Sequence, residues 1–196
     1  FIAACITLSL EYVHSKNVIH RDIKPENLVF DSNGYLHLTD FGIAMEYKEG
    51  EQLLKRSRTP GYMAPEVIFN KEHNFCADYF ALGVIIYELL MDERPYSGKC
   101  KKEIKEQMLA KEVKIKIDYL PEDWEDENII DLINQLLKRK PTKRLGANGI
   151  FEIKSHPWFK DINWINLANG TYTSPFIIDR EDNFDNKYAN KEEDES

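Results

Sequence analysis

Residues 20–27 read His20-Arg21-Asp22-Ile23-Lys24-Pro25-Glu26-Asn27, and two triplets follow this stretch in a fixed order. Asp40-Phe41-Gly42 begins thirteen residues after Asn27, and Ala64-Pro65-Glu66 begins twenty-two residues after Gly42. Each triplet alone is a weak signal, because short matches arise by chance. The three together, in this order and around a predicted hairpin, are too specific to be a chance match.

Short apolar segments flank this stretch and predict its local fold. Residues 18–19 predict a very short strand, and residues 28–30 and 35–38 predict two more. The turn signal Asp31-Ser32-Asn33-Gly34 joins the last two, so we expect a β-hairpin. Residues 40–63 have weak periodicity and many charges, which predicts a long exposed loop.

The remaining segments predict helices. Residues 1–14 place apolar side chains three and four positions apart. Residues 75–91 are apolar nearly all round, which predicts a buried central helix. Residues 101–110 and 128–138 predict amphipathic helices, and residues 149–155 predict a short one. We therefore expect a mainly α-helical chain with one small hairpin at the functional loop.

The amino-acid composition excludes some classes of protein. The chain has 196 residues, of which 42% are hydrophobic and 31% charged, as in a soluble globular protein. Its net charge of -8 argues against a broad basic face, so we expect no nucleic-acid partner. Residues 179–196 are rich in acids and poor in aliphatic side chains, which indicates a flexible tail.

The cysteines and the apolar segments bear on location. Cys5, Cys76 and Cys100 are scattered and form no C-x-x-C pair, which fits a reducing compartment and a cytoplasmic location. Residues 1–10 are apolar but lack the basic segment and cleavage site of a signal peptide, so we interpret them as a buried helix. The apolar run 75–91 contains acids and is too short to span a bilayer.

The three motifs resemble the signature set of the protein kinases, and the reaction that this resemblance implies, phosphoryl transfer, depends on positioning and charge neutralisation. Asp22 can accept the proton of an attacking hydroxyl group, a form of help typically worth about 10²–10⁴ in rate. Asn27 and Asp40 offer oxygen ligands that suit Mg²⁺. Lys24 can reach the moving phosphate as a point charge. Gly42 permits the backbone to turn sharply after Asp40.

These motifs resemble those of the eukaryotic-type protein kinases, and the resemblance covers residues 1–158. It implies the C-terminal lobe of a kinase domain, a mainly α-helical part of an α+β fold, followed by a tail at residues 159–196. It also implies ATP and Mg²⁺ as cofactors. Lys24 is typical of the Ser/Thr class, so the implied reaction is transfer of the ATP γ-phosphate to protein hydroxyls.

The resemblance implies roles for individual residues. The implied catalytic residues are Asp22, Lys24 and Asn27, and the implied magnesium ligands are Asn27 and Asp40. The implied nucleotide contacts are Lys24, Glu26, Asn27, Val29 under the adenine ring, Asp40 and Phe184. The implied structural or regulatory residues are His20, Arg21, Phe41, Gly42, Glu66, Asp78 and Arg144.

Five of these structural residues carry definite expectations. His20 and Phe41 are expected to be buried packing residues rather than catalysts. Asp78, on the central helix, is expected to hold the backbone of the catalytic loop. Arg144 is expected to form a buried bidentate pair with Glu66 that ties the activation segment to the lobe.

The end of the chain resembles one kinase group. Pro175-Phe176, followed by Asn183-Phe184-Asp185, is similar to the C-terminal tail of AGC-group kinases, which include the cyclic-nucleotide-dependent enzymes. In that group the second stretch crosses the mouth of the active site, which places Phe184 near the adenine. The alternative is an ordinary flexible acidic tail.

The resemblance also implies a substrate preference. Glu26 and Glu88 occupy positions that, in similar kinases, bind an arginine upstream of the phospho-acceptor, and two carboxylates suit a guanidinium group. Thr59 matches the residue that contacts the catalytic Asp and Lys beside the substrate. Ile43 resembles the branched residue that favours Thr over Ser as acceptor. The expected partners are therefore proteins with basic residues before the acceptor.

The sequence departs from the family pattern in two respects. It contains no Gly-rich phosphate loop and no Val-Ala-x-Lys strand, which in the family belong to an N-terminal lobe. We therefore expect a fragment that is inactive without that lobe. In the activation segment, Arg58 stands where the family usually has Gly, and Lys55 stands at the usual phospho-acceptor position. Ser57 is a possible substitute acceptor.

Two other functions are compatible with such a chain. A kinase-like C-lobe can act as a non-catalytic protein-interaction module, and a helical domain can be purely structural. Both are disfavoured because neither needs Asp22, Lys24, Asn27 and Asp40 together. The discriminating observation is whether an N-terminal lobe precedes the chain in the native protein.

Overall fold

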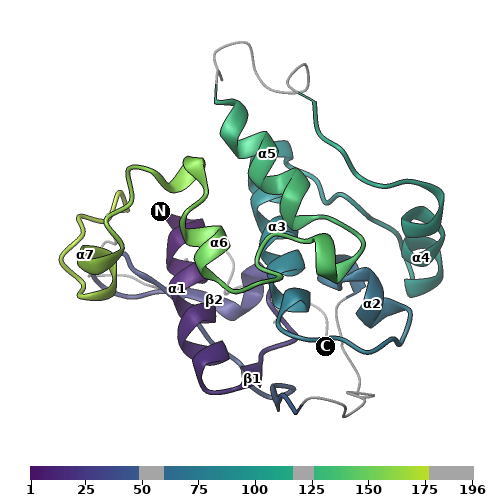
Figure 1. The fold of residues 1–196 in the computed structure, drawn as a ribbon, viewed down its shortest axis with the longest axis horizontal. Helices are drawn as coiled ribbons and strands as arrows, with labels where there is room; N and C mark the ends of the chain where they lie inside the picture. Colours follow the sequence, from purple (N-terminus) through teal and green to yellow (C-terminus); the bar gives the residue numbers. More distant parts are fainter. Residues whose placement is uncertain (49–59, 117–125, 177–196) are drawn as a thin grey trace, which may run out of the picture.

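The computed structural model describes residues 1–48, 60–116 and 126–176, and helices dominate these ranges (Figure 1). The α-helices are α1 (Ile2–Ser15), α2 (Pro65–Ile68), α3 (Cys76–Met91), α4 (Lys101–Ala110), α5 (Glu127–Leu136), α6 (Phe151–Lys154) and α7 (Trp164–Ala168). The short 3₁₀ turns are η1 (Pro25–Asn27), η2 (Pro60–Tyr62), η4 (Pro141–Lys143) and η5 (Pro157–Phe159). The strands are β1 (Val18–Ile19), β2 (Leu28–Phe30), β3 (Leu36–Leu38) and β4 (Met45–Glu46). The expected mainly helical fold is confirmed, while α2 and α7 were not predicted.

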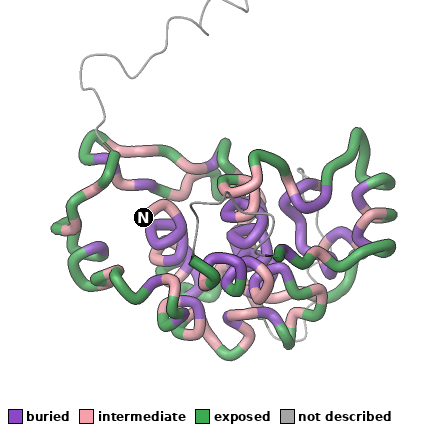
Figure 2. The backbone as a smooth tube through the Cα atoms, turned by 90° about the horizontal axis from the view of Figure 1, so that it is seen from above, coloured by how far each residue is buried: buried purple, intermediate pink, exposed green. Residues whose placement is uncertain are grey.

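Helix α3 is the centre of the core. Phe80, Leu82 and Val84 are completely buried, as expected for a helix that is apolar nearly all round. It packs between α1 and α5 (Figure 1), and buried residues gather in the middle of the molecule (Figure 2). A Cβ atom on Gly83 would lie 2.7 Å from the Cβ of Leu136, so the glycine lets α3 and α5 approach closely.

The predicted hairpin is present as β2 and β3. Its register pairs Val29 with His37, and its turn is closed by Asp31. The Asp31 Oδ1 atom accepts the backbone N–H groups of Asn33 at 2.8 Å and Tyr35 at 2.9 Å. This is the local hydrogen bonding that makes aspartate a turn residue.

A second small sheet was not predicted. Strands β1 and β4 pair antiparallel, with Val18 opposite Glu46 and Ile19 opposite Met45. The prediction of an exposed loop over residues 40–63 is therefore wrong in part, because β4 and the buried Tyr62 and Met63 lie within that segment. A two-residue strand is too short to show a periodicity, and its pairing partner is distant in sequence.

Residues 171–176 lie along the hairpin turn. The Tyr35 hydroxyl donates to the carbonyl of Tyr172, and Ser174 Oγ donates to the carbonyl of Gly34 at 2.8 Å. The ring of Phe176 packs 4.9 Å from that of Phe30. The division into a domain of residues 1–158 and a tail of residues 159–196 stays a prediction, and residues 177–196 lie outside the described ranges. None of the helices in those ranges has the length and apolar composition needed to cross a membrane.

Candidate active site

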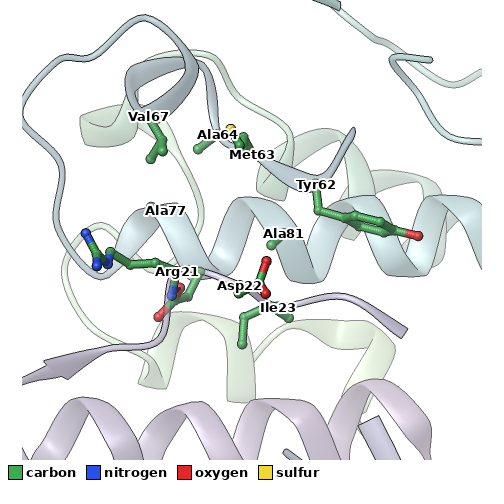
Figure 3. Close-up of a pocket in the computed structure, with 10 residues that line it drawn as sticks. Arg21, Asp22, Ile23, Tyr62, Met63, Ala64, Val67, Ala77 and Ala81 are labelled. Atoms are coloured by element: carbon green, nitrogen blue, oxygen red, sulfur yellow. Dashed lines mark hydrogen bonds between the residues drawn. The ribbon is translucent and has the colours of Figure 1, made fainter. Parts of the chain in front are cut away.

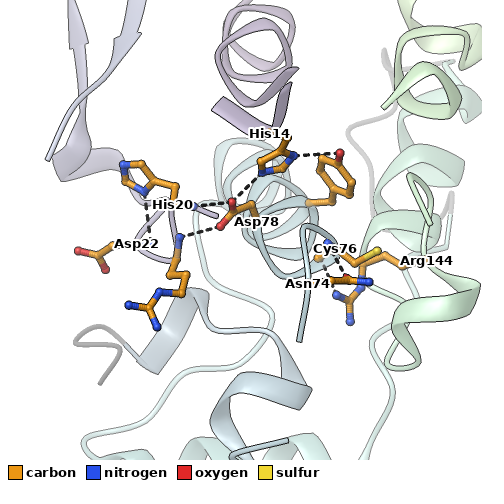
Figure 4. Close-up of polar contacts among 9 residues, drawn as sticks. His14, His20, Asp22, Asn74, Cys76, Asp78 and Arg144 are labelled. Carbon is orange, nitrogen blue, oxygen red and sulfur yellow. Dashed lines mark hydrogen bonds and ion pairs between the residues drawn. The ribbon is translucent and has the colours of Figure 1, made fainter. Parts of the chain in front are cut away.

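Asp78 on α3 holds the start of the loop that carries the first motif. Its Oδ2 atom accepts the N–H of His20 at 2.9 Å, and its Oδ1 atom accepts the N–H of Arg21 at 2.8 Å (Figure 4). His14, from the end of α1, places Nε2 at 2.8 Å from Oδ2, and its Nδ1 lies 3.0 Å from the hydroxyl of Tyr79. Asp78 is 1% exposed, and these polar contacts satisfy its buried carboxylate. The sequence pattern indicated Asp78 but missed His14.

The loop brings Asp22, Lys24 and Asn27 together. The Asp22 Oδ2 atom lies 2.9 Å from Lys24 Nζ and accepts a 3.2 Å hydrogen bond from Asn27 Nδ2. Asn27 Nδ2 also donates to the backbone carbonyl of Asp22 at 2.8 Å. Asp22 and Asn27 are both buried, so their relative positions are set by these contacts. Because its nitrogen is used as a donor, the amide of Asn27 presents its oxygen as an acceptor or ligand.

Thr39 links the first motif to Asp40. Its N–H donates to the carbonyl of Asn27 at 2.9 Å, and its own carbonyl lies 3.0 Å from Nε2 of His20. The hairpin register places Leu28 opposite Leu38, which brings the ends of the strands, and hence Asn27 and Asp40, to the same edge. Thr39 was not identified from the sequence, although its place directly before Asp40 was a usable signal.

The donor set at this edge fits magnesium. Asp40 is exposed, and its Oδ1 atom accepts the N–H of Gly42 at 3.0 Å. One carboxylate and one amide oxygen suit Mg²⁺, which commonly takes one or two protein oxygens and completes its shell with water and phosphate. In the described ranges, no group of three or more His, Cys, Asp or Glu side chains forms a cage of its own.

One prediction about the second motif needs correction, and another is confirmed. Phe41 is 49% exposed, so it is not a buried packing residue, although its ring meets the fully buried His20 edge to face at 4.8 Å. The backbone does turn at Gly42 and Ile43, as predicted, because the N–H of Ala44 donates to the carbonyl of Phe41 at 3.1 Å, and Asp40 just before this turn has a φ of 56°. A Cβ atom on Gly42 would approach Asp40 Oδ1 to 2.9 Å, so the glycine also makes room for the Asp40 side chain.

The other implied nucleotide contacts lie at the surface. Val29 is 51% exposed on β2, and Glu26 is exposed on η1. Phe184 and Thr59 lie outside the described residues, as do Ser57, Lys55 and Arg58. The described part of the chain thus presents Val29 and Glu26 outward on either side of Asn27.

Arg21 connects the loop to the segment after Asp40. Its φ is 69°, a left-handed conformation that is uncommon for a residue with a side chain. Its Nε atom donates to the carbonyl of Ile43 at 2.8 Å. Burial lowers the pKa of Arg21, and the nearby Asp78 opposes that change. The guanidinium therefore helps to position the backbone beside the second motif.

Glu66 and Arg144 form a buried bidentate ion pair. Nη1 lies 2.6 Å from Oε1 and Nη2 lies 2.9 Å from Oε2, and the side chains are 4% and 0% exposed. Arg144 also donates to the carbonyl of Cys76 at 2.7 Å and stacks 5.0 Å from the ring of Phe80. The pair joins α2, which carries the third motif, to the end of η4. The contact of Arg144 with Cys76 extends this link to the start of α3 (Figure 4).

A small cavity separates the loop of the first motif from α2 and α3. It holds about 20 Å³ and is lined by Asp22 and Arg21 on one side and by Ala64, Val67 and Ala77 on the other (Figure 3). This volume is about that of one water molecule. The cavity therefore gives space for a bound water but not for a nucleotide.

Glu88 contacts two side chains of this chain. The Tyr62 hydroxyl donates to Glu88 Oε2 at 2.6 Å, and Arg94 Nε lies 3.8 Å from Glu88 Oε1. Burial, followed by the hydrogen bond to Glu88, raises the pKa of Tyr62. Neither Tyr62 nor Arg94 was identified as part of the site from the sequence.

Comparison with known proteins agrees with this geometry. The family model described as protein kinase domain matches residues 1–159. The chain is 38% identical to cGMP-dependent protein kinase 2 of Homo sapiens over 97% of its length, covering 25% of that protein. It is 38% identical to the cAMP-dependent protein kinase catalytic subunit of Dictyostelium discoideum, over 90% of the chain and 26% of the relative. It is 37% identical to G protein-coupled receptor kinase 4 of Mus musculus, over 91% of the chain and 31% of the relative.

The chain spans about a quarter to a third of the length of these relatives. The family match covers most of the chain and includes all three motifs, the hairpin and the central helix. The chain therefore belongs to the protein kinase domain family, and it resembles the AGC group of Ser/Thr kinases.

Proposed function

We propose that this chain is the catalytic-loop lobe of a Ser/Thr protein kinase that transfers the γ-phosphate of ATP to hydroxyl groups of protein substrates. The observation that carries the proposal is the cluster in which Lys24 and Asn27 both contact Asp22 Oδ2. Thr39 joins that cluster to Asp40 through the carbonyl of Asn27. A structural or binding module has no need for this combination.

Each residue in the cluster has a definite task in this proposal. Asp22 accepts the proton of the substrate hydroxyl, and Asn27 keeps its carboxylate oriented. Lys24, whose ammonium group forms an ion pair with Asp22, stabilises negative charge on the transferred phosphate. Asn27 and Asp40 would hold magnesium, which neutralises phosphate charge when it is bound.

The chain supplies only part of the machinery in this proposal. Its sequence has no Gly-rich phosphate loop, so the nucleotide would be held by residues outside it. We expect weak ATP binding and negligible transfer by the 196 residues alone, and activity in the complete protein encoded by the gene.

We also propose that acceptor sites with upstream basic residues are preferred. Glu26 is exposed beside the catalytic loop, and Glu88 is partly exposed at the end of α3. Carboxylates of this kind accept guanidinium groups through charge-assisted hydrogen bonds.

The test is phosphate transfer from radiolabelled ATP to a basic Thr peptide by the complete protein. Asp22→Asn removes the proton acceptor, so we expect a loss of about 10²-fold or more. Asp31→Asn is the matched control, because Asp31 closes the hairpin turn and asparagine also suits that turn. Equal activity of Asp22→Asn and Asp31→Asn would contradict the proposed function.

A further inference from the structure

Three side chains meet where the end of α3 approaches the turn η2. Glu88 accepts a hydrogen bond from the Tyr62 hydroxyl at 2.6 Å on one carboxylate oxygen and faces Arg94 Nε at 3.8 Å on the other. The guanidinium carbon of Arg94 lies 5.5 Å from the centre of the Tyr62 ring. Figure 3 shows the Tyr62 ring extending along α3, in the direction of the end that carries Glu88. Arg94 therefore contacts both Tyr62 and Glu88, and these three side chains together are called the Glu88 corner.

The backbone around Arg94 is fixed, which keeps its side chain near Glu88. Helix α3 ends at Asp92, whose φ is 55° and whose N–H donates to the carbonyl of Glu88 at 2.9 Å. After this reversal the chain is anchored by Tyr96, which is completely buried. Arg94 stands between these two points, so bringing its guanidinium to Glu88 costs little further ordering.

Gly61 provides the space that Arg94 occupies. A Cβ atom on Gly61 would lie 2.3 Å from Arg94 Nη1. The guanidinium therefore covers the backbone of the segment that leads into Ala64-Pro65-Glu66, and a side chain at position 61 would displace it. The contact thus joins the segment just after α3 to η2.

The negative charge of Glu88 is already partly balanced by the positive charge of Arg94. Glu26 adds to the effect of burial and of Glu88 in raising the pKa of Tyr62, so its carboxylate acts on the Glu88 corner. Glu26 and Glu88 are the carboxylates proposed to receive a substrate arginine. Arg94 brings an internal positive charge to one of them before any substrate binds.

We propose that Arg94 is a specificity-determining residue, an internal guanidinium that occupies Glu88 and weakens the selection of an upstream arginine in the protein substrate. The inference rests on the proposed function and refines its substrate class. An arginine of the substrate must compete with Arg94 for the carboxylate of Glu88. It is also repelled by the positive charge of Arg94. Arg94 and Glu88 are 35% and 30% exposed, so the pair is weak enough for such competition.

The test measures binding of two fluorescein-labelled Thr peptides that differ only in having arginines or glutamines two and three residues before the acceptor. Fluorescence polarisation with the 196-residue chain gives the affinity ratio of the two peptides. We expect Arg94→Gln to raise that ratio about threefold to tenfold, the scale of a partly exposed ion pair plus a removed repulsion. Raising the salt concentration shrinks the gain.

Lys102→Gln is the matched control. It makes the same change in charge at an exposed position on α4 whose partner is Glu106, so it leaves the ratio unchanged. Arg94→Lys keeps the positive charge and stays close to wild type. In the double variant Glu88→Gln and Arg94→Gln, the gain disappears because the receiving carboxylate is gone.

An unchanged ratio in Arg94→Gln, including the case in which neither peptide binds, overturns the proposal. A gain that persists without Glu88 overturns it as well. Phosphate transfer by the complete protein is measured separately, so absence of transfer contradicts the proposed function and leaves the peptide ratio as an independent result.

Discussion

Removing one partner of the Glu66–Arg144 pair is expected to destabilise the chain more than removing both. Arg144→Met keeps much of the apolar volume but takes away the two guanidinium contacts, at 2.6 and 2.9 Å, from Glu66. The Glu66 side chain is only 4% exposed, so its carboxylate stays buried without that partner. In the double variant, Glu66→Met removes the stranded charge.

The expected losses of unfolding free energy follow from the burial of the two side chains. Stranding a buried charge costs about 3–5 kcal/mol, whereas replacing a buried pair by apolar residues is often neutral. Arg144 also donates to the carbonyls of Cys76 and Lys138, which lose a donor in both variants. Each such loss costs about 1–3 kcal/mol. We therefore expect Arg144→Met to be the least stable protein and the double variant to recover about 2 kcal/mol or more of that loss.

The assay is urea unfolding of the wild type, both single variants and the double variant, followed by circular dichroism. With a slope of about 2 kcal/mol per molar urea, a loss of 3–5 kcal/mol moves the midpoint by about 1.5–2.5 M. The free energies form a double-mutant cycle, which isolates the coupling between the two residues. A coupling energy near zero, with additive losses, would refute the view that the pair ties α2 to the rest of the lobe.

Two further predictions concern the hairpin and the acid stability of the chain. Gly34→Ala places a Cβ atom 2.4 Å from the Phe176 carbonyl oxygen and should lower the unfolding free energy by about 1–3 kcal/mol, whereas Gly170→Ala carries the same left-handed strain with nothing within 4 Å. Hydrogen exchange at the Phe176 amide, which donates to the Ser174 Oγ atom that is itself bonded to Gly34, should rise only in Gly34→Ala, and equal effects of the two variants would contradict docking of residues 171–176 on the turn. Glu152 has its pKa lowered from 4.5, mainly by the hydrogen bond from Asn148, so its contribution is present above about pH 4.5 and is lost as the pH falls through the lower folded value. The urea midpoints of wild type and Glu152→Gln should therefore converge between pH 6 and pH 3, and a constant difference would refute this assignment.

The parts of the fold with a strong local signal were predictable from the sequence. The apolar residues 75–91 became α3, and the turn signal at Asp31 became the β2–β3 hairpin, because each depends on contacts close in sequence. The two-residue strands β1 and β4 illustrate the opposite case. Only β1 was predicted, because β4 exists through pairing with a strand about 27 residues away and carries no pattern of its own.

The candidate site also contains residues that the sequence predicted and residues that it did not. Asp22, Lys24, Asn27 and Asp40 were identified because their spacing is a specific motif. His14, Thr39, Tyr62 and Arg94 were missed because each acts through a partner that the fold brings from a distant segment or another strand. The exposure of Phe41 was also unpredictable, since a motif states which residue is present but not which neighbours cover it.

The geometry of the loop that carries the first motif is imposed by the helical core. Arg21 adopts a left-handed φ of 69°, a conformation that costs a residue with a side chain about 1–2 kcal/mol. That cost falls directly beside Asp22, and the two backbone hydrogen bonds to Asp78 offset it. Asp78 can accept them only because α3 is fixed against α1, where His14 holds the same carboxylate. Packing of the core therefore sets the backbone that leads into Asp22, and a core substitution that shifts α3 against α1 should change the loop before it unfolds the chain.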